Sequence, residues 1–174
     1  MEIINSYKQT IPKVKFIGKK YGDVDRVDGG FGFAWKQWIT NNWFEPIEKA
    51  AGGREACQAI YEDGNACLGY MRYKEGEPFE YWIGMFTPVD TEVPEGYESV
   101  DVEQSNCGIC WYYGQEPDIY GKEDQAMNKL RELGMTIKSD NQDAFWFFER
   151  YSPNRFDKAD EKGCVVLDIG FYVD

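Results

Sequence analysis

The chain contains no histidine in its 174 residues, and this absence limits the chemistry that it can perform. Histidine is the side chain that ordinarily titrates near neutral pH. Without it, the serine–histidine and cysteine–histidine nucleophile pairs are excluded. Any acid–base chemistry must therefore use carboxylates, tyrosine, lysine or cysteine.

Basic side chains are also few, with 19 Lys and Arg against 31 Asp and Glu and a net charge of −12. The basic residues are scattered singly among acids and form no basic run. This balance repels a phosphate backbone, so we predict no direct nucleic-acid binding. A cationic small molecule is compatible with the charge, as is a protein partner.

No stretch approaches the 18 apolar residues of a membrane span, and no apolar signal sequence opens MEIINSYKQT. We therefore expect a cytoplasmic protein that does not enter a membrane. Five cysteines, an odd number, do not indicate a disulfide framework. Cys107 and Cys110 have CxxC spacing, but no second pair completes a zinc site, so we interpret them as buried strand residues. We expect neither a metal nor a cofactor.

Aromatic residues are abundant instead, with 6 Trp, 12 Tyr and 11 Phe making 17% of the chain. This excess is typical of a ring-lined ligand site, although a ring-rich core is the alternative. The length and the 43% hydrophobic content suit one domain over residues 1–174.

One order of elements occurs twice along the chain. Periodicity predicts a strand at 12–21, a helix at 31–53 that is bent near Asn41 and Asn42 or at Pro46, and strands at 55–63, 66–74 and 77–86. It then predicts an extended segment at 98–114, a helix at 118–134 and strands at 143–151 and 162–173. The units span about 12–87 and 98–173.

Short connections and sequential hairpins favour an α+β fold with duplicated β-α-β-β units. We predict a mostly antiparallel sheet with its two main helices on one face. The two units are expected to be related by a pseudo-twofold axis. A groove on that axis is a natural place for a central ligand pocket.

Glu149 is the residue that calls for an explanation, because it interrupts the aromatic run AFWFFERY. In a strand, Glu149 shares a face with Phe147 and Tyr151, while Arg150 points to the other face. A carboxylate among rings is at a wet sheet edge, paired with a cation, or in a cavity. The pairing partner would be Arg150, Arg155 or a lysine.

The segment YWIGMFTPVDTEVPEGYESVDVEQSNCGICWYYG, together with the Glu-x-Tyr of FERY and a last alternating strand, resembles the GyrI-like small-molecule-binding domains. That family also forms the effector-binding half of AraC-type and MerR-type transcription regulators. The resemblance covers about residues 12–173. It implies an eight-stranded sheet and an aromatic pocket whose base holds a glutamate, here Glu149, that meets lipophilic cations.

No helix-turn-helix precedes Lys13, so we expect a stand-alone member without a DNA-binding domain. Members of this kind include binding or sequestering proteins. They also include hydrolases that open the cyclopropane ring of DNA-alkylating natural products. In such a hydrolase Glu149 would be the general base, with Tyr151 as a further candidate. A third possibility is an interaction protein without a small ligand.

Strand faces suggest further pocket residues around Glu149, Phe147 and Tyr151. Trp111 and Tyr113 alternate along the strand expected to enter the same half. Tyr81 and Trp82 point to opposite faces of their strand, so only one of them can line the pocket. The first helix adds Trp38 and Trp43. All these residues are candidates for ligand binding.

Overall fold

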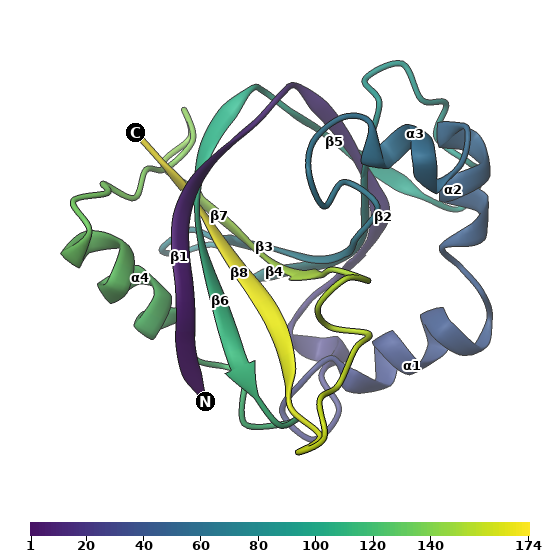
Figure 1. The fold of residues 1–174 in the computed structure, drawn as a ribbon. Helices are drawn as coiled ribbons and strands as arrows, with labels where there is room; N and C mark the ends of the chain where they lie inside the picture. The colour runs from purple at the N-terminus through teal and green to yellow at the C-terminus, as the bar shows by residue number, and fades with distance from the viewer.

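The computed structural model describes residues 1–174 and contains one antiparallel sheet of eight strands (Figure 1). The strands are β1 (Glu2–Ile11), β2 (Val14–Tyr21), β3 (Cys67–Tyr73), β4 (Glu80–Thr87), β5 (Glu98–Val102), β6 (Ser105–Gly114), β7 (Phe145–Tyr151) and β8 (Val165–Val173). Their order in the sheet is β1-β6-β8-β7-β3-β4-β2-β5. The predicted α+β class with an antiparallel sheet is confirmed.

The strand order is symmetric about the central β3–β7 pair, as a pseudo-twofold axis requires. Each half consists of two strands, a helical segment and two more strands. The first strand of each half pairs with the second strand of the other half, β1 with β6 and β5 with β2. The structure adds one strand to each predicted unit. Residues 2–11, for which no element was predicted, form β1, and the single extended segment predicted over 98–114 forms both β5 and β6.

The helices are α1 (Gly32–Thr40), α2 (Glu45–Ala51), α3 (Arg54–Gln58) and α4 (Glu123–Glu132). The prediction of one helix over 31–53 is wrong in its continuity, because two helices occupy the segment, and the break lies at Asn41 and Asn42, where a bend was predicted. Asn42 adopts a left-handed backbone with φ 52°, which ends α1, and Pro46 then occupies the first turn of α2. The second helix begins at Glu123 rather than at residue 118.

The strand predicted over 55–63 is also wrong, because α3 and a turn occupy this segment. Cys57 of α3 is fully buried in the core that α1, α2 and α3 form with the sheet. A Cβ at Gly64 would lie 2.1 Å from the Cys57 carbonyl oxygen, so a glycine lets the turn fold back over α3. Short apolar segments do not distinguish a helix from a strand by periodicity alone.

All four helices pack on one face of the sheet. Ile17, Tyr81 and Ile83 pack with α1–α3, while Tyr112 and Leu167 pack with α4. The sheet is strongly curled (Figure 1). Its other face encloses a separate core of large side chains. These include Phe16, Leu68, Tyr70, Trp82, Phe86, Phe148 and Tyr172.

Cys107 and Cys110 are both fully buried strand residues, as predicted. Their thiols lie in different cores, Cys107 on the curled face and Cys110 against α4. No group of three His, Cys, Asp or Glu side chains is placed to hold a metal ion. No helix is both long enough and apolar enough to cross a membrane.

Candidate functional site

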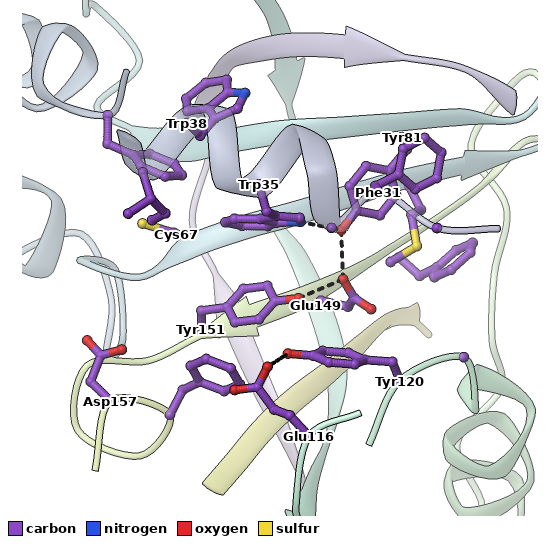
Figure 2. Close-up of a pocket in the computed structure, with 18 of the residues that line it drawn as sticks. Phe31, Trp35, Trp38, Cys67, Tyr81, Glu116, Tyr120, Glu149, Tyr151 and Asp157 are labelled. Carbon is purple, nitrogen blue, oxygen red and sulfur yellow. Dashed lines mark hydrogen bonds between the residues drawn. The ribbon is translucent and has the colours of Figure 1, made fainter. Parts of the chain in front are cut away.

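A cavity of about 1090 Å³ lies on the helix-covered face of the sheet, near its central strands (Figure 2). Residues of α1, β3, β4 and β7 line it, together with the loops before α1 and α4 and the loop after β7. Its rings are Phe31, Trp35, Trp38, Phe44, Phe79, Tyr81, Tyr120, Phe147, Tyr151 and Phe156. Both halves of the chain contribute, which agrees with the expected central pocket.

Glu149 lies on the wall of this cavity and is only 6% exposed. Its Oε2 accepts hydrogen bonds from the hydroxyls of Tyr81 at 2.8 Å and Tyr151 at 3.1 Å. The indole N–H of Trp35 donates to the Tyr81 oxygen at 2.8 Å. Figure 2 shows these hydrogen bonds, through which Trp35 of α1 and Tyr81 of β4 hold the carboxylate of Glu149 on β7 in place.

Burial raises the pKa of Glu149 to about 7, because desolvation disfavours the charged carboxylate. The hydrogen bonds from Tyr81 and Tyr151 act in the opposite direction, and the nearby charge of Glu123 raises the pKa further. Burial and the adjacent carboxylate also hold the pKa of both tyrosines well above the ordinary value. Glu149 can therefore change its charge near neutral pH while both phenols stay protonated.

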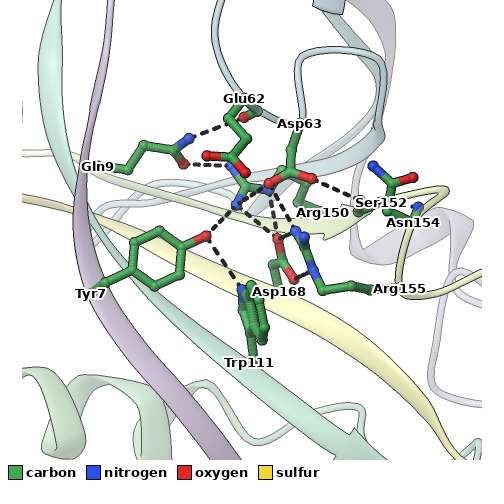
Figure 3. A network of polar contacts seen from close by, with 10 residues as sticks. All are labelled: Tyr7, Gln9, Glu62, Asp63, Trp111, Arg150, Ser152, Asn154, Arg155 and Asp168. Carbon is green, nitrogen blue, oxygen red and sulfur yellow. Dashed lines mark hydrogen bonds and ion pairs between the residues drawn. The ribbon is translucent and has the colours of Figure 1, made fainter.

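No arginine or lysine pairs with Glu149, so the interpretation that Arg150 or Arg155 stabilises it is wrong. Arg150 points to the opposite face, where its Nε donates to Asp168 at 2.8 Å (Figure 3). Arg155 donates to the same carboxylate at 3.0 Å and lies 2.9 Å from Asp63. Because successive strand residues point to opposite faces, this network of two arginines and two aspartates lies on the other side of the sheet from Glu149.

Aromatic rings enclose the carboxylate and its hydrogen-bond donors. Phe31 stacks on Tyr81, with ring centroids 4.1 Å apart and planes 8° from parallel. Trp35 packs on Tyr151 at 4.6 Å, and Phe156 meets the edge or face of Tyr151 at 4.7 Å. The faces of such rings attract cations.

The cavity is acidic as well as aromatic. Its carboxylates are Glu48, Glu116, Glu123, Glu149 and Asp157. The two basic residues are each paired with a carboxylate. Arg54 donates to Glu48 at 2.7 Å, and Arg26 donates to Asp23 at 2.8 Å. The unpaired charge on the wall is negative.

Gly69 of β3 lies directly opposite Glu149 in the sheet. A Cβ at this position would lie 2.5 Å from the Tyr81 hydroxyl and 2.9 Å from Glu149 Oε2. A glycine thus leaves the space in which the carboxylate and the phenol meet.

Five of the predicted site residues lie on the cavity wall: Trp38, Tyr81, Phe147, Glu149 and Tyr151. Of the pair in β4, Tyr81 is the residue that faces the cavity. Trp82 points to the curled face, as the alternation requires.

The prediction that Trp111, Tyr113 and Trp43 line the same cavity is wrong. Trp111 is on the curled face beneath the guanidinium of Arg155, whose Cζ is 4.4 Å from the ring centroid. Tyr113 donates to Asp160. Strand β8 lies between β6 and β7, so β6 does not adjoin Glu149. Trp43 lies beyond α1 and stacks its ring under Lys19, with Nζ 4.1 Å from the centroid.

Sequence reasoning missed several cavity residues. The helical spacing of Phe31 and Trp35 places them on one face of the predicted helix, but a face that packs in the core has the same spacing, so the pattern alone did not assign them to the cavity. Glu116 and Tyr120 come from an irregular loop, where the Tyr120 hydroxyl donates to Glu116 at 2.7 Å. No periodicity marks such loop residues in advance.

No family model matches this sequence, and no curated protein is significantly similar to it. The fold is nevertheless shared with solved structures over nearly the whole chain. SAV2435, in a structure with bound tetraphenylphosphonium, has a TM-score of 0.55 at 15% identity, covering 98% of this chain and 94% of its own.

Two further structures have the same fold. A bacterial transcription regulation protein from Staphylococcus aureus MU50 has a TM-score of 0.51 at 15% identity, covering 98% of each chain. A hydrolase from Listeria innocua, encoded by lin2189, has a TM-score of 0.50 at 11% identity, covering 97% of this chain and 91% of its own. At these identities the similarity shows the fold alone.

Proposed function

We propose that this protein binds lipophilic aromatic cations in the cavity around Glu149, as a sensing or sequestering domain of the GyrI-like type. The observation that carries the proposal is a buried carboxylate, without a basic partner, on the wall of an aromatic cavity. Burying a charge without a partner is costly. A bound cation would supply the missing partner.

The aromatic walls fit the same class of ligand. A cation placed over the rings of Trp35 or Tyr151 gains a cation–π attraction of about 0.5–2 kcal/mol. The volume of about 1090 Å³ is just above the range for drug-sized ligands, about 300–1,000 Å³. A ligand with several rings is therefore the expected size.

The hydrogen-bond donors of the wall argue against an anionic ligand. The indole N–H of Trp35 and the hydroxyls of Tyr81 and Tyr151 all donate within the series of hydrogen bonds that ends at Glu149. Tyr120 donates to Glu116 in the same way. The surfaces left for a ligand are ring faces and carboxylate oxygens, which suit a cation.

Tetraphenylphosphonium, the ligand bound to SAV2435 in the similar structure, is a suitable probe. Tetraphenylborate has nearly the same shape and the opposite charge. Calorimetric titration at a pH above the pKa of Glu149 should show binding of the cation and much weaker binding of the anion. Equal affinities would contradict the proposal.

Glu149→Gln tests the role of the carboxylate in the same assay. This change keeps the shape and removes the charge, so affinity for the cation should fall by about 1.5–3 kcal/mol, the scale of a hydrogen bond to a charged group. Glu103→Gln is the matched control, because it removes an exposed carboxylate outside the cavity. Unchanged affinity in Glu149→Gln would overturn the proposal.

A second candidate function is the hydrolytic opening of a cyclopropane ring in a DNA-alkylating natural product. A carboxylate with a pKa of about 7 suits a general base, and this observation favours the candidate. Glu149 would take a proton from water, the hydroxyl would bond to a cyclopropane carbon, and the electrons of the broken bond would pass to the conjugated carbonyl. That oxygen would then take up a proton.

The same variant distinguishes the two functions. For a hydrolase, Glu149→Gln should leave binding of the cyclopropane compound nearly intact and lower turnover by about 10²-fold or more. Mass spectrometry would detect the product as the compound with one added water. No product with the wild-type protein would exclude this candidate.

A further inference from the structure

A second cavity of about 720 Å³ adjoins the first and shares Phe79, Glu123 and Phe147 with it. Its other walls are mostly apolar side chains of β3, β7, β8 and α4 and of the segment after α4. They include Tyr73, Met127, Met135, Phe145 and Phe171. Because these three residues line both cavities, the cavities are neighbours, and together they are referred to as the groove.

The β3–β7 pair connects the two cavities. Cys67 and Tyr151 pair at one end of this ladder and line the first cavity, while Tyr73 and Phe145 pair at the other end and line the second. The two cavities thus lie toward opposite ends of the same pair of strands.

The two halves of the groove differ in charge. The buried carboxylate of Glu149 lines the first cavity and not the second. Apart from the shared Glu123, the only charged residue of the second cavity is Arg131, which is exposed. One half can neutralise a cation, and the other offers apolar surface.

The apolar surface of the second cavity is open to a ligand. The side chain of Tyr73 is 51% exposed, and that of Phe145 is 39% exposed. Clustered exposed apolar side chains beside a cavity mark ligand sites. Methionines such as Met127 adapt to ligands of different shape.

We propose that the groove selects elongated amphiphilic cations, with the charged aromatic head beside Glu149 and an apolar tail passing Phe147 into the second cavity. The inference rests on the proposed function and adds the shape of the ligand class. In this arrangement the second cavity holds the tail of the molecule whose head lies beside Glu149. The tail is apolar because most of the side chains around the second cavity are apolar.

A series of alkyltriphenylphosphonium ions, from methyl through butyl and hexyl to decyl, tests this inference by calorimetry. Affinity should rise by up to about fourfold for each methylene that becomes buried, and then level off when the tail fills the cavity. Phe145→Ser and Tyr73→Ser should flatten this rise and leave binding of the methyl ion unchanged. Two variants are used so that one remains if the other does not fold.

Phe33→Ser is the matched control, because Phe33 is a 54% exposed phenylalanine that lines neither cavity. Its affinities should rise along the series as in the wild type. Binding of the methyl ion without a gain from longer chains would overturn the inference alone. The same gain in Phe145→Ser and Tyr73→Ser as in the wild type would also overturn it. Failure of the methyl ion to bind would overturn the proposed function as well.

Discussion

The affinity for cations should depend on pH because Glu149 titrates near neutrality. Burial raises its pKa from 4.5 to about 7 in the free protein, and a cation beside the carboxylate should lower it again. If the bound cation restores the ordinary value, the ionised form binds more tightly by about 3 kcal/mol. Affinity should then fall about tenfold for each pH unit below about 7, and should be constant above it.

The same proton affects the stability of the free protein. Since the folded chain binds the proton more tightly than the unfolded chain, the free energy of unfolding should fall as pH rises from about 4.5 to about 7. The contribution is fully present below the unfolded pKa and is lost above the folded one. It amounts to about 3 kcal/mol. Glu149→Gln should remove this dependence and stabilise the protein above neutral pH.

Calorimetric titrations of tetraphenylphosphonium at several values between about pH 5 and pH 8 would measure this effect, and urea unfolding over the same range would measure the stability. Near pH 6 the binding heat should vary with the ionisation enthalpy of the buffer, because binding releases close to one proton. Glu149→Gln should show neither effect. A wild-type affinity that is independent of pH, or the same slope in Glu149→Gln, would refute the reasoning.

Three further substitutions have defined outcomes. Gly69→Ala should lower cation affinity by about tenfold, since its Cβ would displace the Tyr81 hydroxyl and the Glu149 carboxylate by steric overlap; wild-type affinity by calorimetry would contradict this. Tyr81→Phe removes one donor to Glu149, so the midpoint of the pH-dependent affinity should rise by about one to two units, and an unchanged midpoint would count against that hydrogen bond. Arg150→Met leaves Asp168 with one fewer buried partner and should lower the free energy of unfolding by about 3–5 kcal/mol in urea titrations, whereas a loss below about 1 kcal/mol would show that the network is dispensable.

The alternation of side chains between the two faces of a strand was the pattern that predicted the site best. It placed Glu149 with Phe147 and Tyr151 and sent Arg150 to the other face, as the structure shows. Alternation acts within one strand and depends only on backbone geometry. It therefore needs no knowledge of neighbouring strands.

The same reasoning failed where the site depends on the order of strands. Trp111 was expected near Glu149, but β8 lies between β6 and β7 and Trp111 faces the curled core. Strand order follows from contacts between distant segments, which a local pattern does not contain. The exchange of β1 and β5 between the two halves was missed for the same reason.

Local backbone preferences also overrode helical spacing. The apolar spacing over 31–53 indicated one helix, but Asn42 adopts φ 52° and divides it. The break lets α1 present Trp35 to Tyr81 while α2 packs separately on β4. Glu116 and Tyr120 reach the cavity from a loop, whose path depends on tertiary packing.

A crystal structure of the protein with tetraphenylphosphonium tests the central claim most directly, because it locates the charge of the ligand. We predict that the phosphonium lies in the cavity beside the Glu149 carboxylate, with the rings of Phe31, Trp35 and Tyr151 around its phenyl groups. The cationic centre should lie within about 6 Å of at least one ring centroid of the wall. A cation bound elsewhere on the acidic surface, with the cavity around Glu149 unoccupied, would contradict the account.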